Sequence, residues 1–232
     1  MKSTHPTDLN KRRVLQALAS GLLGVPSLPL QAQALGRVPG PLPAGQSIYN
    51  TRGTVSVNGV NTTSVTTISA NDTVVTGTSS QIIFVVGKDA FLMRENSRLK
   101  LSGNGFLVEG MQLLSGAVLS VFGKSRHQLK VGTATVGIRG TGVYAQAQAD
   151  AAYICTCYGV VDIGADGSTE SETIESKHHD APRYIASSGS KRITPAPFID
   201  HSDEELMLIE TLVGRVPPFS LFDPGYGGRR QY

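Results

Sequence analysis

Long apolar runs are absent from the sequence, and most of its length also lacks helical periodicity. The longest apolar segment, Val14 to about Leu30, is interrupted by glycine and proline and falls short of the ~20 apolar residues of a membrane-spanning helix. We therefore expect no transmembrane segment in the mature chain. Cysteine is scarce as well, because the 232 residues contain only Cys155 and Cys157, separated by a single threonine.

Residues 1–34 have the three parts of an export signal. The basic segment Lys11-Arg12-Arg13 precedes the apolar run, and the triplet Ala32-Gln33-Ala34 predicts cleavage after Ala34. The alternative, an amphipathic helix of the mature fold, conflicts with the prolines in the run, which break helices. The basic segment is similar to the twin-arginine motif with lysine where the first arginine is usual, so both general and twin-arginine export stay open. We expect a periplasmic protein, soluble after cleavage.

The mature chain also lacks net charge. Removal of residues 1–34 leaves 17 of the 21 basic residues and 17 of the 18 acidic residues. A nucleic-acid partner requires basic charge on the mature surface. We therefore expect no nucleic acid among the partners.

Residues 53–163 carry short β-branched or alternating runs, each closed by a turn signal such as Asn-Gly, while residues 35–52 read as an extended lead-in. Even spacing and the absence of helical periodicity predict an all-β domain. The runs that we expect to be strands are Thr54–Val57, Ser64–Ile68, Gln81–Val86, Ala90–Met93, Arg98–Leu101, Phe106–Val108, Met111–Leu114, Ala117–Phe122 and Gln128–Val131.

A sandwich and a solenoid both fit this pattern. Sandwich strands usually alternate apolar and polar residues, whereas a run such as Ile82-Ile83-Phe84-Val85-Val86 is apolar throughout. We therefore favour a solenoid-like, coiled stack of short strands.

The end of the chain changes in character. Residues 164–200 form a polar extension with two further expected strands, Thr173–Glu175 and Arg183–Ala186. A helix is expected at 201–214, because Ser202 and Glu205 fit a capping box. Its apolar side, Leu206, Ile209 and Val213, either docks on the sheet or binds a partner. Residues 215–232 are expected to form a flexible tail.

The motif Gly137-Ile138-Arg139-Gly140-Thr141-Gly142-Val143 resembles the FecR-domain family, named for a periplasmic regulator of ferric-citrate uptake. Three further segments, 72–80, 91–99 and 114–118, resemble family segments in order and spacing. The resemblance covers residues 53–163 and implies a FecR-like β-domain without catalytic residues. The family's anti-sigma segment, transmembrane helix and receptor-contacting domain are not expected in this chain, so a transcriptional role does not carry over.

The glycines of this motif have a physical interpretation of their own. Gly137, Gly140 and Gly142 indicate backbone that turns sharply or passes close to a neighbour. A phosphate-binding loop is excluded, because neither the helix nor the lysine of such a loop follows. Arg139 either braces the turn by binding carbonyl groups or binds an anion.

The two cysteines allow three interpretations. In a strand they share one face with Cα atoms ~6.6 Å apart, near the upper limit for a disulfide. They are small core residues, a strained disulfide, or two ligands of one Zn or Cu ion. In the third case Cys155 and Cys157 act with His178 or His179 and with His201.

Catalysis is the weaker alternative. Cys157 with His178 and Asp180 could form a nucleophile, a base and its orienting group, but such trios are easily found in a chain with five histidines. We expect no enzyme. The first functional hypothesis is an exported FecR-domain binding, scaffolding or sensing module whose partner is an envelope protein or a cell-wall component. The second is a metal sensor or carrier.

Overall fold

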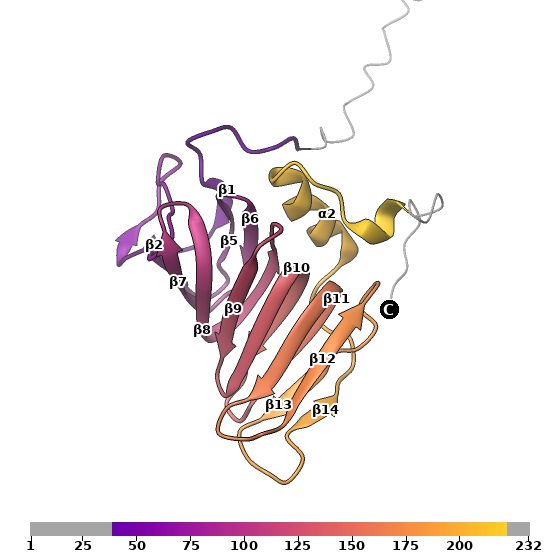
Figure 1. Ribbon diagram of the computed structural model, residues 1–232. Helices are drawn as coiled ribbons and strands as arrows, with labels where there is room; N and C mark the ends of the chain where they lie inside the picture. The colour runs from indigo at the N-terminus through magenta and orange to yellow at the C-terminus, as the bar shows by residue number, and fades with distance from the viewer. Residues whose placement is uncertain (1–38, 222–232) are drawn as a thin grey trace, which may run out of the picture. The chain divides into compact units, whose positions relative to one another are not determined.

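Three long strands organise the fold, which is a computed structural model describing residues 39–221 (Figure 1). They are β8 (Leu107–Val121), β10 (Ala134–Ala147) and β11 (Ala151–Ala165). The first half of β8 pairs with β7 and β9, and its second half pairs with β6 and β10. β11 likewise pairs with β13 near its start and with β12 near its end. Each long strand therefore passes from one part of the sheet to another.

The shorter strands extend this framework to a 14-stranded sheet within the described residues. They are β1 (Ile48–Arg52), β2 (Val55–Val57), β3 (Val60–Asn61), β4 (Thr73–Thr76), β5 (Gln81–Val86), β6 (Asp89–Met93), β7 (Arg98–Asn104), β9 (Arg126–Val131), β12 (Ser171–Ser176), β13 (Arg183–Ala186) and β14 (Ile193–Pro195). The described part of the chain is thus mostly β, as expected, with α2 as its one α-helix.

The long strands bend at glycines. Gly116 in β8, Gly140 in β10 and Gly159 in β11 all have positive φ, which other residues rarely adopt. The register of β10 against β11 shifts on both sides of Gly142, where a Cβ atom would lie 2.6 Å from the ring of Tyr158. The glycine motif is therefore the place where β10 bends and passes close to β11.

The apolar run at residues 82–86, from which we inferred a solenoid-like stack, has a different cause. Every residue of β6 is buried, and so is nearly every residue of β5. One face of these strands packs in an inner core with Phe84 and Phe91, whose rings stack at 4.9 Å, and the other packs in an outer core with Leu92 and helix residues. Covering on both faces removes the alternation that a one-sided strand shows.

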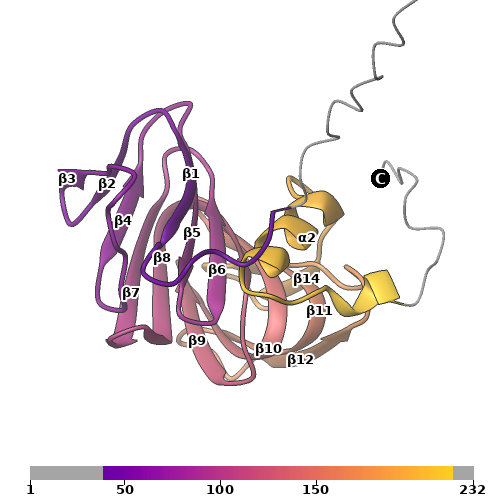
Figure 2. The same cartoon turned by 90° about the horizontal axis from the view of Figure 1, so that it is seen from above.

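The expected solenoid is accordingly not confirmed. The strand pairs of the sheet are antiparallel except for β8 with β9, and the sheet does not close on itself. Figure 2 shows the sheet from above, with the helical segment against one side of the curved strands.

The prediction of a strand at Ser64–Ile68 is wrong. This segment forms a turn, in which the hydroxyl of Thr66 accepts a hydrogen bond from the backbone N–H of Thr63, while the Val65 side chain is 84% exposed. The runs Phe106–Val108, Met111–Leu114 and Ala117–Phe122 are one continuous strand, β8, apart from their ends. The two strands expected in the polar extension are confirmed as β12 and β13. The sheet also takes β1 from the expected lead-in and β14 from the polar extension.

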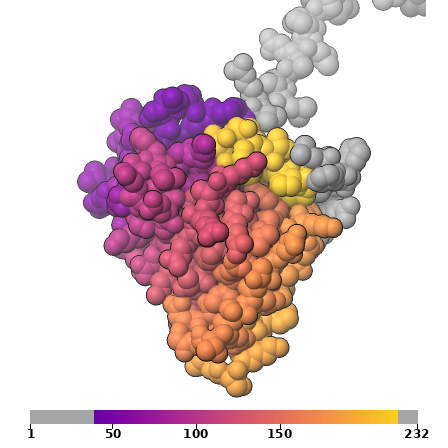
Figure 3. Space-filling model, in the orientation of Figure 1, coloured from indigo at the N-terminus to yellow at the C-terminus, as the bar shows by residue number. Residues whose placement is uncertain are grey.

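Helix α2 (Asp203–Leu212) begins with the expected capping box, since the Ser202 hydroxyl accepts from the Glu205 N–H and the Glu205 carboxylate accepts from the Ser202 N–H. Leu206, Ile209 and Leu212 are buried in the outer core. The sheet therefore covers two of the three side chains proposed as a partner surface, while Val213 is half-buried. Figure 3 shows the helical segment, in yellow, beside the violet N-terminal part of the described chain.

Salt bridges and hydrogen bonds fasten both ends of α2. Arg94, directly after β6, makes a bidentate pair with Glu205 at 2.7 Å. At the other end, Tyr158 of β11 donates a hydrogen bond to Glu210, and Arg215 binds the same carboxylate at 2.6 Å. The short helix η1 (Pro218–Leu221) follows, so the first residues of the expected tail contact the sheet domain.

The expected export signal, residues 1–34, and the tail from residue 222 lie outside the described residues. Within residues 39–221, no helix combines the length and the apolar character needed to cross a membrane.

We predict that Gly159→Ala lowers the free energy of unfolding by roughly 2–4 kcal/mol, since it adds both backbone strain and a core clash. The φ of Gly159 is +88°, and its Cβ would lie 2.4 Å from Cγ2 of Thr141. Gly167→Ala is the control: its φ is +73°, but no atom of the described part of the chain lies within 4 Å of the added Cβ, so only the strain of about 1 kcal/mol applies. Urea unfolding measures the free energy of unfolding of both variants. An equal loss of stability in the two would contradict the proposed clash with Thr141.

Candidate metal centre

Cys155 and Cys157 lie on one face of β11 and point into the outer core. Both side chains are 0% exposed, and both cysteines are free thiols. Their shared face follows from the two-residue repeat of a strand. Because the outer core is also the docking face of α2, the thiols face the segment that leads into this helix.

Two histidines from separate segments approach the thiols. His179 follows β12, and its backbone N–H donates a hydrogen bond of 2.9 Å to the backbone carbonyl of Cys157. His201 lies immediately before the helix cap. His179 and Asp200 both have positive φ, at 53° and 58°, a costly conformation that requires support from the surrounding structure. Each imidazole thus lies at or next to a residue with positive φ.

The ligand atoms of Cys155, Cys157, His179 and His201 all lie within 4.8 Å of one another. Sγ of Cys155 is 3.4 Å from Nδ1 of His179, and Sγ of Cys157 is 3.4 Å from Nε2 of His201. The two nitrogens are 3.2 Å apart. A tetrahedral zinc ion with Zn–S of ~2.3 Å and Zn–N of ~2.05 Å would place S and N ~3.6 Å apart and two N atoms ~3.3 Å apart.

Hydrogen bonds on the far side of each ring fix the tautomers. Nδ1 of His201 is 2.6 Å from the carbonyl of Ile199, which only accepts, so Nδ1 carries the hydrogen. Nε2 of His179 is 3.1 Å from the carboxylate of Asp203. In the neutral form of each ring, the nitrogen that faces the other ring and the thiols is therefore the one without a hydrogen. This is the arrangement by which outer hydrogen bonds orient metal-bound histidines.

Without a metal ion, protons have to occupy the space between these lone pairs. The Cys157 thiol and hydrogen bonds from His179 and His201 lower the pKa of Cys155 to about 4, against the effect of burial. Burial and the same thiol contact raise the pKa of Cys157. Burial opposes protonation of His179, but hydrogen bonds to Asp203 and Cys155 outweigh it and raise its pKa. These shifts favour a proton on His179 over one on Cys155, and a cation bound by the four side chains would take the place of the protons between them.

Cys155, His179 and Asp203 also have the order of a nucleophile, its base and an orienting carboxylate. The Cys155 side chain is 0% exposed, however, so a substrate has no access to the thiolate. The trio Cys157, His178 and Asp180 is not assembled. Asp180 instead accepts hydrogen bonds from the backbone of Lys177 and His178.

Aromatic rings surround the cluster. Tyr144 of β10 stacks on His201 with ring centroids 4.5 Å apart, and burial raises its pKa to about 12. The ring of Phe198 packs against both imidazoles, with its centroid 4.6 Å from that of His179 and 4.4 Å from that of His201. These apolar walls exclude water and strengthen electrostatic interactions within the cluster.

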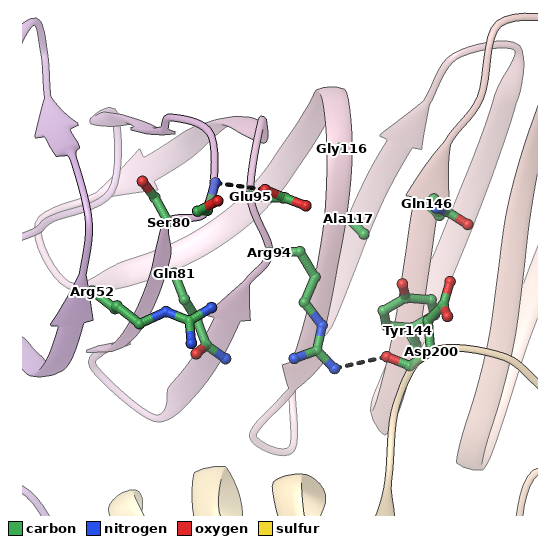
Figure 4. Close-up of a pocket in the computed structure, with 11 residues that line it drawn as sticks. Arg52, Ser80, Gln81, Arg94, Glu95, Gly116, Ala117, Tyr144, Gln146 and Asp200 are labelled. Atoms are coloured by element: carbon green, nitrogen blue, oxygen red, sulfur yellow. Dashed lines mark hydrogen bonds between the residues drawn. The ribbon is translucent and has the colours of Figure 1, made fainter.

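A polar pocket of about 510 Å³ lies beside this wall and includes Tyr144 and Asp200. Figure 4 shows Arg94 crossing it to the carbonyl of Asp200, a hydrogen bond of 2.7 Å. Arg94 therefore holds the residue that precedes His201, in addition to Glu205 of the helix.

The sequence left the choice between His178 and His179 open, and the structure places His179 on the thiols. Nε2 of His178 lies 2.8 Å from Asp203 instead. Sequence analysis missed Asp203, whose only signal was its place in the helix cap, and Tyr144, for which there was no signal. Arg139 pairs with Asp162 at 2.5 Å on the exposed surface of β11 rather than with carbonyl groups.

No family model and no curated protein matches the chain. It is similar to two crystal structures, each of a candidate anti-sigma factor from Parabacteroides distasonis ATCC 8503. The first has 9% identity and a TM-score of 0.43 over 53% of this chain and 58% of that one. The second has 10% identity and a TM-score of 0.42 over 61% and 59%. The match spans less than two thirds of each structure. These scores are too low to carry an argument, so membership of the FecR-domain family stays a prediction.

We predict that Asp203→Asn lowers the free energy of unfolding by about 1–3 kcal/mol at pH 7, since it removes the charged acceptor of two imidazoles. Burial opposes ionisation of Asp203, but hydrogen bonds from His179 and His178 outweigh it and hold its pKa below the usual value. The stabilisation is therefore complete above about pH 4, the unfolded pKa, and is lost as the pH falls through the lower folded value.

Chemical unfolding of the chelator-treated protein at several pH values measures this difference. Glu204→Gln is the matched control, because Glu204 neighbours Asp203 at the start of α2 but is exposed. A loss that is equal for the two variants, or that persists unchanged below the folded pKa, would show that the Asp203 charge is not responsible.

Proposed function

We propose that the protein is a non-enzymatic, exported binding module in which a metal ion at Cys155, Cys157, His179 and His201 controls the docking of the C-terminal segment. The observation that supports the proposal most directly is the convergence of two thiols and two imidazole lone pairs, all within 4.8 Å. The two S···N distances of 3.4 Å and the N···N distance of 3.2 Å are close to those around a tetrahedral zinc ion.

The charge of the cluster favours Zn²⁺ over Cu⁺. Both ions suit thiolate and imidazole ligands. Two thiolates and two neutral imidazoles neutralise Zn²⁺ completely, whereas with Cu⁺ they leave a net negative charge. All four side chains lie in a nearly water-free core, where an unbalanced charge is expensive. Zinc is therefore the metal that we propose.

Burial of the donors favours a structural or regulatory centre over a catalytic one. Catalytic zinc sites keep one position open for water or substrate, whereas structural sites are filled by four protein ligands. Here the four positions are filled by the side chains of the chain itself. We accordingly propose a role for the ion that involves no catalysis.

The ligands connect three separate segments: the strand β11, the loop after β12, and the residues before α2. Binding of the ion is thereby coupled to docking of the helix. Leu206 and Ile209 are covered when the helix is docked, so release of the metal would expose them and the strands below. A partner in the cell envelope, a protein or a cell-wall component, would then encounter different surfaces in the two states.

We predict that the purified mature protein holds one equivalent of zinc and that Cys155→Ser/Cys157→Ser holds none. Chelation should lower the unfolding temperature of the wild type by about 5–10 °C, since ligand at 100 times its Kd contributes ~2.7 kcal/mol. Chelation should leave the double variant unchanged. Elemental analysis and calorimetry measure these quantities, and Co²⁺ substitution tests for thiolate ligation by its charge-transfer absorption.

Thr156→Val is the matched control. Thr156 lies between the cysteines on the same strand, and its buried hydroxyl has no hydrogen-bond partner within residues 39–221, so its replacement leaves the four ligands intact. A wild type that contains no metal and gains none on incubation with Zn²⁺ would refute the proposal. So would a double variant that keeps its equivalent.

A further inference from the structure

The four donors of the buried centre give an ion no direct contact with water. Cys155 and Cys157 are 0% exposed, His201 is 7% exposed, and the side chain of His179 is 5% exposed. Metal ions in water are hydrated, so an ion that reaches this centre has to exchange water for protein ligands on the way. The exposed side of the cluster should therefore offer intermediate ligands.

His178 and Asp203 lie on that side, with side chains 21% and 12% exposed. Nε2 of His178 is 2.8 Å from Oδ1 of Asp203, and Nε2 of His179 is 3.1 Å from the same oxygen. These three ligand atoms lie within 4.8 Å of one another and form a second cluster able to hold a cation. His179 belongs to both clusters, since Nδ1 faces the thiols and Nε2 faces Asp203. A neutral imidazole carries its one hydrogen on either nitrogen, so Nε2 can bind an ion when the hydrogen is on Nδ1, and Nδ1 can bind it when the hydrogen is on Nε2.

We propose that His178, His179 and Asp203 form an outer metal position through which Zn²⁺ enters and leaves the buried centre. This inference rests on the proposed function. Two imidazoles and one carboxylate are good ligands for Zn²⁺, and three protein ligands leave further positions for water. The outer position accepts a partly hydrated ion, and the inner one, a single imidazole ring away, completes its dehydration with two thiolates.

The ring of Phe219 stacks on His178 with centroids 4.4 Å apart. This contact places the short helix η1 against the outer position. An element of the C-terminal segment therefore borders the path of the ion. Exchange of the ion should then depend on whether this segment is docked.

A simpler role for these residues is to orient the ligand His179, and the two roles have different consequences. An orienting group changes the affinity of the centre. A group that relays the ion lowers the barrier in both directions, so its loss slows binding and release together. The ratio of the two rates, and with it the Kd, then changes far less than either rate.

His178→Gln separates these roles, because the glutamine amide can still donate a hydrogen bond to Asp203 but replaces the imidazole ligand. Zn²⁺ uptake by the metal-free full chain and Zn²⁺ release to a chromogenic chelator are followed by stopped flow. We expect both rates to fall about tenfold or more, the scale of effects around metal ligands, with one equivalent still bound. Lys177→Gln, an exposed neighbour, should exchange at the wild-type rate.

Wild-type rates in His178→Gln would overturn the outer position while leaving the buried centre in place. Faster release with weaker affinity would also overturn it, because His178 would then act by holding His179 in position. A second bound equivalent in the wild type, lost in His178→Gln, would support the outer position directly. A wild type that binds no Zn²⁺ would refute both the outer position and the proposed function.

Discussion

The structure depends on the need to satisfy two imidazole lone pairs and two thiols inside an apolar core. These groups face one another on the covered side of β11, where water does not reach them. Buried polar groups without partners destabilise a protein, so the cluster must share protons or a cation. The hydrogen bonds from His179 to Asp203 and from His201 to Ile199 make the requirement strict, because they fix which nitrogen of each ring points inward.

This constraint explains why the C-terminal segment is part of the domain. The strand β11 supplies two donors, but the other two come from loops that need α2 and its cap in place. Arg94 supports the loop before His201 by binding the carbonyl of Asp200, and it supports the start of α2 by binding the carboxylate of Glu205. The helix therefore docks by polar contacts at its ends and by Leu206 and Ile209 along its length.

The glycine motif serves the same arrangement at a distance. Gly140 and Gly142 let β10 bend and pass close to β11, and Tyr144, two residues after Gly142, lies in the outer core. There its ring stacks on His201. The motif thus shapes the sheet, and the proposed metal ligands Cys155 and Cys157 lie on the next strand, β11.

The sequence by itself determined the β class, the single helix with its cap, and the residue types of the centre, since strand periodicity and capping are local properties. It placed Cys155 and Cys157 on one face for the same reason. Only the tertiary structure decided between His178 and His179, because two adjacent residues in a loop have no periodicity that orients them. It also decided the architecture: β5 and β6 are apolar because two cores cover them, and a local pattern does not distinguish this cause from stacking in a solenoid. The contribution of Asp203 could not be read from its neighbours, because the partners of its carboxylate lie more than twenty residues away.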